Sequence, residues 1–317
     1  MADQAVVDHH ATKLAQVLPP DTGWITFAPG EQSKSLEQAA YLYDQLAAAA
    51  ADRDCLIVSF GGGVAGDLGG FVASTWLRGV RHVNVATTVL AAVDAGVGGK
   101  TGVNLPAGKN LVGTFHQPLA VIVDTDFFTT LPRREFAAGL AESVKQAAAL
   151  DVDLFEWQEQ HAAALCSGQT DLLVLLVRRN CELKGRVVAQ DEREIGPRVV
   201  LNYGHTIGHA IEHLLGYELR HGECVALGMI AENDIAVRRG LLDPSAADRV
   251  RQLLGALGLP GRLPRALPPE EVVSACRRDK KARDGAIHCV LLRSLGSWER
   301  VSDIRPEEVA AALTAIT

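Results

Sequence analysis

The sequence lacks several features that define other classes of protein. Its apolar runs fall short of the ~18 residues that a membrane-spanning helix needs, and its first residues, MADQAVVDHHATK, contain neither region of a signal peptide. Acidic residues (38) outnumber lysine and arginine (31), so the net charge of −7 gives no electrostatic case for binding nucleic acid or an anionic membrane. The six cysteines are scattered without a Cys-x-x-Cys pair, which argues against a disulfide framework. We therefore expect a cytoplasmic globular protein.

The pattern of apolar residues divides the chain into two parts. In the first, short β-branched runs at 55–60, 82–87 and 120–123 alternate with helical patterns at 35–51 and 67–76, which is typical of a parallel α/β sheet. In the second, amphipathic helical stretches follow one another at 134–149, 152–164, 170–189, 204–215, 222–239, 244–257 and 269–277. One late strand is expected at 286–292. The sequence thus predicts an α/β domain over residues 1–133 and a mainly α-helical domain over residues 134–317.

A glycine-rich segment, SFGGGVAGD at residues 59–67, lies where a strand should turn into a helix. Glycines there let the backbone approach a pyrophosphate, whose charge a helix N-terminus favours. The spacing is not GxGxxG and the lysine of a P-loop is missing, so a tight turn that needs positive φ explains the segment equally well. Asp67 is then either a carboxylate that stabilises the first helical turn or an acceptor for a ligand.

A second glycine-punctuated segment, residues 93–110, reads VDAGVGGKTGVNLPAGKN and contains Asp94, Lys100, Lys109 and Asn110. We interpret it as a loop. Lysine supplies positive charge and asparagine both a donor and an acceptor, which suits phosphate and polyhydroxylated ligands. An ordinary solvent-exposed loop is the alternative, although long loops without secondary structure are usually functional.

The helical half contains the residues best suited to bind a metal. His205 and His209 are one helical turn apart and His221 follows after a turn, while Glu142 offers a further oxygen ligand. A solvated or hydrogen-bonded histidine pair is the alternative. Glu142 also lies three residues before Lys145 on one helix face, where a surface ion pair is the ordinary explanation.

Another charge-dense stretch leads into the histidine-rich helix. Lys184 is followed by Asp191-Glu-Arg-Glu194 and by Arg198, a pattern that usually marks a solvated helix end and loop.

Taken together, these segments resemble the 3-dehydroquinate synthases of the sugar-phosphate cyclase superfamily. The resemblance runs from GEQSKSLE near Gly30 to the end of the chain. The motifs that carry it occur in the same order as in that family: GGGVxGD, Thr87-Thr88, VDxxVGGKTGxN, GKN, LPxREFxxGLAE, DEREIGxRxxLNxGHTxGHAIE and HGExVAxGM. The resemblance implies a dehydroquinate synthase-like fold, with a Rossmann-like cofactor domain followed by a helical domain for metal and substrate.

The resemblance also implies an activity. Such a lyase uses NAD and a metal, Zn2+ with Co2+ as a possible substitute, to convert 3-deoxy-D-arabino-heptulosonate 7-phosphate into 3-dehydroquinate and phosphate in the shikimate pathway of aromatic biosynthesis. An amino-dehydroquinate synthase or another secondary-metabolite cyclase is the main alternative. A catalytically weak paralogue and an iron-dependent alcohol dehydrogenase are further alternatives.

By resemblance, the metal ligands are Glu142, His205 and His221, and His209 contacts substrate and assists proton transfer. Other substrate contacts implied by the family are Lys145, Lys184, Arg198, Asn202, Asp94, Lys100, Asn110 and Lys280 or Lys281. Arg78 resembles an arginine that reaches the phosphate from the neighbouring subunit, which implies a homodimer. The implied NAD site consists of Glu31, Lys34, Gly62, Gly63, Asp67, Thr87, Thr88, Lys109 and Thr130, with Asp8, after a short strand at Val6-Val7, as the ribose-binding acid.

Two departures from the family pattern stand out. Family members usually carry additional N-terminal residues that form the first strands of the cofactor domain, so we expect either that the sheet edge is completed differently here or that the native chain is longer. The chain also has Glu142-Ser-Val-Lys145-Gln where Glu-Val-Ile-Lys-Tyr is commoner, which keeps both charged positions and changes the local packing.

Overall fold

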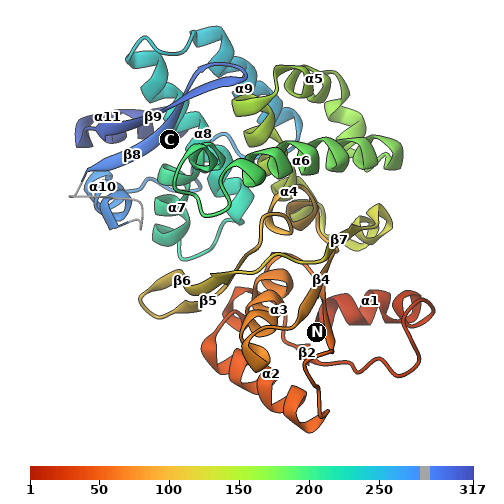
Figure 1. Cartoon of the computed structure of the whole chain (residues 1–317). Coiled ribbons are helices and arrows are strands. Elements are labelled where there is room, and N and C mark those ends of the chain that lie inside the picture. The colour runs from red at the N-terminus through yellow and green to blue at the C-terminus, as the bar shows by residue number, and fades with distance from the viewer. Residues whose placement is uncertain (279–285) are drawn as a thin grey trace. The chain divides into compact units, whose positions relative to one another are not determined.

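The structure is a computed structural model that describes residues 1–278 and 286–317. The chain divides into two compact units, Met1–Pro132 and Arg133–Thr317 (Figure 1). Within the described ranges, no helix is long and apolar enough to cross a bilayer. The predicted fold class is confirmed, since the first unit has a parallel α/β sheet and the second is mainly helical.

The first unit is built on a five-stranded parallel sheet in the order β2-β1-β3-β4-β7. The strands are β1 (Ala2–Asp3), β2 (Thr26–Phe27), β3 (Leu56–Gly61), β4 (Arg81–Ala86) and β7 (Ala120–Val123). The strands expected at 55–60, 82–87 and 120–123 are thereby confirmed. β3 and β4 pair over their whole lengths, with Val58 opposite Val83. β-Branched residues are frequent in these three segments, which is why the strands were readable in the sequence.

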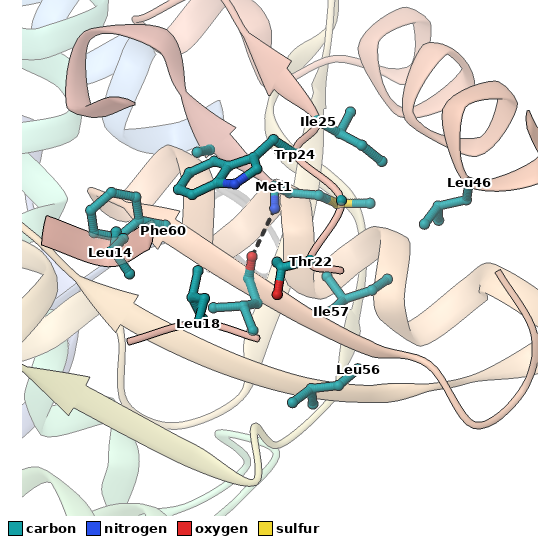
Figure 2. A pocket seen from close by; sticks show the side chains of 13 residues that line it. Met1, Leu14, Leu18, Thr22, Trp24, Ile25, Leu46, Leu56, Ile57 and Phe60 are labelled. Carbon is teal, nitrogen blue, oxygen red and sulfur yellow. Dashed lines mark hydrogen bonds between the residues drawn. The ribbon is translucent and has the colours of Figure 1, made fainter. Parts of the chain in front are cut away.

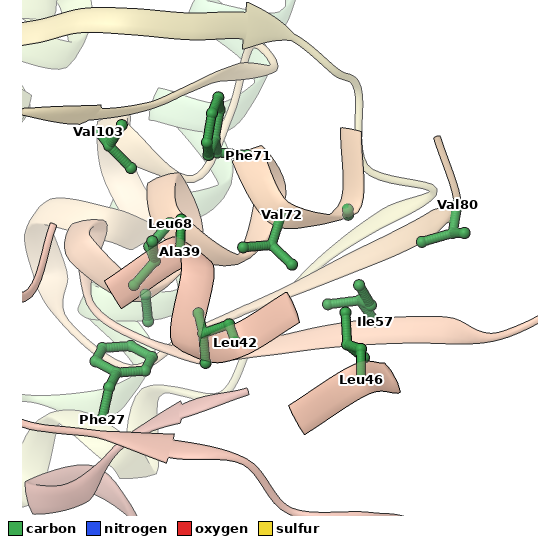
Figure 3. Packing of buried hydrophobic residues seen from close by; sticks show 12 residues of the cluster. Phe27, Ala39, Leu42, Leu46, Ile57, Leu68, Phe71, Val72, Val80 and Val103 are labelled. Atoms are coloured by element: carbon green, nitrogen blue, oxygen red, sulfur yellow. The ribbon is translucent and has the colours of Figure 1, made fainter. Parts of the chain in front are cut away.

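Helices pack on this sheet through a core of buried apolar side chains (Figure 3). In α2 (Leu36–Ala48), Ser35 caps the N-terminus by accepting a hydrogen bond from Gln38 N. α3 (Gly63–Thr75) approaches β3 closely, because a Cβ at Gly69 would lie only 2.0 Å from Ser59 Oγ. The glycines of this helix therefore set the distance between helix and sheet. Leu42 on α2 and Leu68 and Val72 on α3 are fully buried in this core.

Two expectations for the first unit were wrong. The segment interpreted as a loop at 93–110 contains most of a β-hairpin, β5 (Lys100–Leu105) and β6 (Gly108–Phe115), with Lys100 opposite Phe115. Its frequent glycines hide the alternation by which a strand is recognised. The short strand at Val6-Val7 is instead part of helix α1 (Gln4–Ala15), which begins where Asp3 accepts a hydrogen bond from Ala5 N.

A small apolar cavity of about 100 Å³ lies where α1 meets β1 and β3 (Figure 2). Leu14, Leu18, Ile57 and Phe60 line it, and the amino group of Met1 donates a 2.8 Å hydrogen bond to the carbonyl of Val58 beside it. The contact ties the chain's first residue to the middle of β3.

The second unit consists mainly of helices. They are α4 (Arg133–Leu150), α5 (Val152–Cys166), α6 (Thr170–Gln190), α7 (His205–Leu214), α8 (His221–Arg238), α9 (Pro244–Ala256), α10 (Pro269–Arg278) and α11 (Pro306–Leu313). The first seven confirm the predicted helical stretches. The late strand is β8 (Ile287–Ser294), and it pairs with β9 (Ser297–Ile304), which, like α11, was not predicted.

Glycines bring α4, α7 and α8 into backbone contact. A Cβ at Gly208 would lie 2.8 Å from the carbonyl oxygen of Cys224, and one at Gly228 only 1.9 Å from that of Gly204. On the other side of α8, a Cβ at Gly222 would lie 1.8 Å from the carbonyl oxygen of Ala138 on α4. Side chains from these three helices can therefore meet at one point.

Candidate active site

Side chains of α4, α7 and α8 converge within the second unit. Oε1 of Glu142 lies 3.5 Å from Nε2 of His205 and 3.2 Å from Nε2 of His221. One turn along α7, His209 joins them, and potential ligand atoms of the three histidines all lie within 4.8 Å of one another. A carboxylate oxygen and imidazole nitrogens at this spacing are a donor set suited to a divalent metal such as Zn2+.

The orientation of two imidazoles is set from behind. Nδ1 of His205 lies 3.1 Å from the carbonyl oxygen of Tyr203, and Nδ1 of His221 lies 3.2 Å from Oε2 of Glu212. A proton on each Nδ1 would satisfy these acceptors and leave the Nε2 lone pair directed at the cluster, as metal-binding histidines require. Glu142 itself is fully buried, and neither of its oxygens has a hydrogen bond of ordinary geometry among the described residues. The donor set fits a bound cation.

The electrostatics of the cluster also favour a cation. Burial opposes ionisation of Glu142, but the ammonium of Lys145 and the imidazole of His221 outweigh it and hold the pKa of this carboxyl well below its usual range. Burial likewise opposes protonation of His221, but Glu142 and Glu212 raise the pKa of its imidazole to about 10. The two carboxylates thus favour positive charge beside His221, which a metal ion bound at Nε2 would supply in place of a proton.

Two lysines of the predicted substrate site are buried in the same unit. Lys145 is 1% exposed and forms a close ion pair with Oε2 of Glu142, and Lys184 on α6 is 6% exposed. The alternative of a surface ion pair between Glu142 and Lys145 is therefore wrong. Burying an ammonium group is costly without compensation, and the pairing of Lys145 with Glu142 compensates for the burial of this lysine.

The segment between α6 and α7 begins with residues 191–197, which are largely exposed to solvent, as expected for a helix end and loop, and which form an ordered turn. The carboxylate of Asp191 accepts hydrogen bonds from the backbone N–H groups of Ile195, Gly196 and Arg198, at 2.9, 2.8 and 3.1 Å. Arg198 is 1% exposed and donates to the carbonyl oxygen of Glu192. Asn202, at the end of a 3-10 helix (Pro197–Asn202), donates a 2.6 Å hydrogen bond to Oε1 of Glu194.

Sequence reasoning missed Glu212 and Asp191 as structural partners of this site. A signal for Glu212 was present, because residues 205, 209 and 212 recur at helical spacing and share one face of α7. No comparable signal existed for Asp191, whose role follows from the path of the backbone after it.

The first unit holds the glycine-rich segment at the N-terminus of α3. Gly62 is the N-cap residue and provides no side-chain cap, and a Cβ there would lie 3.0 Å from Cγ2 of Thr88. The hydroxyl of Thr87 is buried and has no hydrogen-bond partner among the described residues. An uncapped N-terminus of a 13-residue helix suits an anionic group such as a pyrophosphate.

Other residues of the predicted NAD site form contacts with one another in this unit. Lys34 is buried and pairs closely with Asp67. Oε1 of Glu31 accepts a 2.8 Å hydrogen bond from Nδ2 of Asn104 and lies 4.0 Å from Nζ of Lys109. Asp67 therefore forms an ion pair with Lys34, in addition to any stabilisation of the first turn of α3.

The remaining predicted residues are dispersed over the first unit. Thr130 Oγ1 lies 2.8 Å from His10 Nε2, and Gly63 is the first residue of α3. Asp8 is an exposed residue of α1 that accepts a 2.7 Å hydrogen bond from Gln4, so the strand on which its proposed ribose contact depended does not exist. Asp94 lies in a π-helix (Ala91–Ala95) and Lys100 begins β5.

Two further residues of the predicted site, Asn110 and Arg78, have unusual backbone conformations. Asn110 has φ 53°, and its N–H donates to Asn104 Oδ1 at 2.9 Å. Arg78 is exposed, and both it and Leu77 have positive φ, 71° and 48°. Non-glycine residues rarely adopt this conformation, and such strain often accompanies functional positions. Lys280 and Lys281 lie outside the described residues.

The sequence is similar to one family throughout most of its length. Residues 24–138 match the family model described as 3-dehydroquinate synthase N-terminal, and residues 139–282 match 3-dehydroquinate synthase C-terminal. The 3-dehydroquinate synthase of Desulforamulus reducens is 44% identical over 99% of this chain and 89% of its own length. That of Symbiobacterium thermophilum is also 44% identical, over 93% of this chain and 83% of its own length.

Solved structures of related enzymes have the same fold. A 2-epi-5-epi-valiolone synthase from Streptomyces hygroscopicus with NAD+ and Zn2+ bound has a TM-score of 0.92 at 31% identity, covering 99% of this chain and 88% of its own. A 2-deoxy-scyllo-inosose synthase complexed with carbaglucose-6-phosphate, NAD+ and Co2+ has a TM-score of 0.89 at 28% identity, covering 99% and 89%. Glycerol dehydrogenase from Schizosaccharomyces pombe, at 20% identity, TM-score 0.66 and coverage of 99% and 81%, shares the fold alone.

Proposed function

Because the chain belongs to the 3-dehydroquinate synthase family, we propose that it converts 3-deoxy-D-arabino-heptulosonate 7-phosphate into 3-dehydroquinate and inorganic phosphate. The reaction would require NAD and a divalent metal, Zn2+ or in its place Co2+, and would serve the shikimate pathway in the cytoplasm. The observation that carries the proposal is the convergence of Glu142, His205 and His221, with both Nε2 atoms facing one carboxylate oxygen. Two related cyclases whose structures contain NAD+ with Zn2+ or Co2+ support the choice of cofactors.

We assign the metal to Glu142, His205 and His221. When bound, NAD accepts and returns a hydride, and the metal polarises the hydroxyl that is oxidised. His209 lies beside the three ligands, with its ring centroid 5.1 Å from that of His205, and we assign it to substrate contact and proton transfer. A ring nitrogen of His209 also lies close enough to those of His205 and His221 to bind the same metal ion. Metal affinity after replacement of His209 therefore distinguishes a fourth metal ligand from a residue that only transfers protons.

The anionic groups of the substrate require cations, although the chain as a whole is acidic. Arg198 is suited to bidentate recognition of a carboxylate, and Lys145 and Lys184 provide buried ammonium groups. Asn202 contributes an amide at the end of the same turn as Arg198. Asp94, Lys100 and Asn110 complete the proposed contacts with ring hydroxyls and phosphate.

The NAD site is assigned to the first unit. Gly62 and Gly63 at the start of α3 would receive the pyrophosphate on backbone N–H groups. The hydroxyl of Thr87 is buried and has no hydrogen-bond partner in the part of the chain that the structure describes, which supports a ligand beside it. The remaining proposed NAD contacts are Glu31, Lys34, Asp67, Thr88, Lys109 and Thr130.

We further propose a homodimer in which Arg78 binds the phosphate held by the partner subunit. The exposure of Arg78 and its strained backbone support this assignment. A flexible surface arginine would have no need of two consecutive residues with positive φ.

The alternative is another sugar-phosphate cyclase, such as an amino-dehydroquinate synthase. The likeness to the valiolone and inosose synthases favours it, but the higher identity to 3-dehydroquinate synthases, 44% against 31% and 28%, supports the first choice. Because Arg198 and Asn202 suit a substrate with a carboxylate, the oxygen and nitrogen analogues must be separated by experiment.

The test is phosphate release from 3-deoxy-D-arabino-heptulosonate 7-phosphate, in the presence of NAD and Zn2+ or Co2+, before and after treatment with EDTA. We expect release that depends on both cofactors, with 3-dehydroquinate as the product. Binding of metal and NAD without turnover would favour the amino analogue or another sugar phosphate, and both substrates should then be compared. Failure to bind NAD would contradict the assignment of the first unit.

A further inference from the structure

A second buried carboxylate, Glu232 on α8, faces the start of the helix that carries His205. Its side chain is fully buried, and its oxygens accept hydrogen bonds from three backbone N–H groups at the N-terminus of α7, one of them from the N-cap residue. The distances are 2.7 Å from Gly204 N, 3.1 Å from Thr206 N and 3.3 Å from Ile207 N. These donors belong to the first turn of the helix, whose N–H groups have no partners within the helix.

The residue at the N-cap of α7 does not supply a cap of its own. Helices usually obtain one from a serine, threonine, aspartate or asparagine side chain at this position. Here the residue is Gly204, with φ 78°, and a Cβ on it would lie 2.5 Å from Cγ of Met229 and 2.9 Å from the carbonyl oxygen of Val225. Close packing against α8 therefore excludes a local cap, and α8 itself provides the carboxylate.

The capped amides flank His205 on both sides. Gly204 precedes the histidine and Thr206 follows it, so Glu232 fixes the backbone on either side of this residue. The next residue of α8, Asn233, accepts a 2.8 Å hydrogen bond from the hydroxyl of Tyr203. The carbonyl oxygen of Tyr203 in turn lies 3.1 Å from Nδ1 of His205. Two consecutive residues of α8 thus control the position and the ring orientation of one histidine.

From these contacts we propose that Glu232 is a positioning residue for the metal centre. It acts by holding the first turn of α7 so that Nε2 of His205 faces Glu142, without itself contacting metal or substrate. A negative charge at a helix N-terminus is also stabilised by the helix dipole. This inference rests on the proposed function to the extent that His205 is a metal ligand.

The test is the variant Glu232→Gln, which keeps the size of the side chain but places an amide against three N–H donors. The purified variant and the wild-type chain would be titrated with Co2+ against a competing chelator, and the visible spectrum of the bound Co2+ would be recorded. We expect about 10- to 100-fold weaker metal binding, the range typical when an outer partner of a ligating histidine is lost. We also expect an altered spectrum, because the geometry of His205 changes, and a lower kcat in saturating metal.

The matched control is Glu308→Gln, which makes the same substitution at a partly buried glutamate elsewhere in the second unit. Glu308 lies on α11 and forms a 2.7 Å ion pair with Arg239. Removing this carboxylate should lower stability without a direct effect on α7. We expect its Co2+ affinity and spectrum to equal those of the wild type. A general loss of stability cannot then account for a change that is confined to Glu232→Gln.

If Glu232→Gln does not fold, Glu232→Asp retains the charge with a shorter reach and should show a smaller loss of Co2+ affinity with a shifted spectrum. Wild-type affinity and spectrum in a folded Glu232 variant would overturn the inference alone. A wild-type chain that binds no Co2+ would contradict the proposed metal centre, and with it this inference.

Discussion

The imidazole of His221 lies between two carboxylates, with Nδ1 3.2 Å from Oε2 of Glu212 and Nε2 3.2 Å from Oε1 of Glu142. The two acids come from different helices, α7 and α4, and are 7% and 1% exposed at their side chains. Glu142 faces the proposed metal position, and Glu212 holds the ring on its opposite side through Nδ1. Such a carboxylate–histidine pair fixes the tautomer and raises the basicity of the ligand nitrogen.

Replacing Glu212 by glutamine should therefore weaken the metal centre without removing a ligand. We expect metal affinity to fall about 10- to 100-fold, measured by competition with a chelator. Glu218→Gln is a suitable control, because Glu218 is an exposed residue that pairs with Arg265 on the surface. Equal affinities of the Glu212 variant and the wild type would contradict the orienting role.

Replacing His221 by alanine should abolish metal binding and activity while the fold persists, since catalytic metal sites need not drive folding. The control is His213→Ala, which changes an exposed histidine of α7. Metal content after dialysis and the far-UV circular dichroism spectrum give the two readouts. Wild-type metal content in His221→Ala would exclude this residue as a ligand.

Complementation tests whether Arg78 serves the partner subunit. Arg78→Ala and Lys145→Ala should each have little activity alone, but a mixture that is allowed to exchange subunits should recover part of it. In a mixed dimer, one site then combines an intact Lys145 with an intact Arg78 from the partner. Recovery must depend on exchange, so covalently crosslinked homodimers mixed in the same way should stay inactive.

The pH dependence of stability follows from Glu308. Its hydrogen bonds with Arg239 hold the pKa of this carboxyl at about 2 in the folded chain, below its ordinary value of 4.5. A depressed pKa contributes stability that is fully present above the unfolded value and is lost as the pH falls from about 4.5 toward 2. Glu308→Gln should be less stable than the wild type at neutral pH, and the difference should shrink with acidification. A difference that does not change with pH in thermal melts would contradict this account.

Periodicity made the helices of the second unit predictable, because each has an apolar face that must be buried. The β-hairpin β5–β6 was not, since glycines at 102, 108 and 113 interrupt the alternation that marks a strand. At Val6-Val7, two β-branched residues suggested a strand, but the cap provided by Asp3 begins a helix there. Local propensity is overridden where capping or pairing satisfies the backbone better.

The sequence by itself determined the family, the fold class and the chemical types gathered for a metal and an anionic substrate. His205 and His209 were identified as neighbours because a helical spacing places them on one face. The tertiary structure decided that Glu142 meets histidines of α7 and α8, that Lys145 is a buried partner and that Glu212 and Glu232 hold ligands in place. These relationships join residues far apart along the chain, and they depend on how closely glycines allow the helices to pack, which no local pattern encodes.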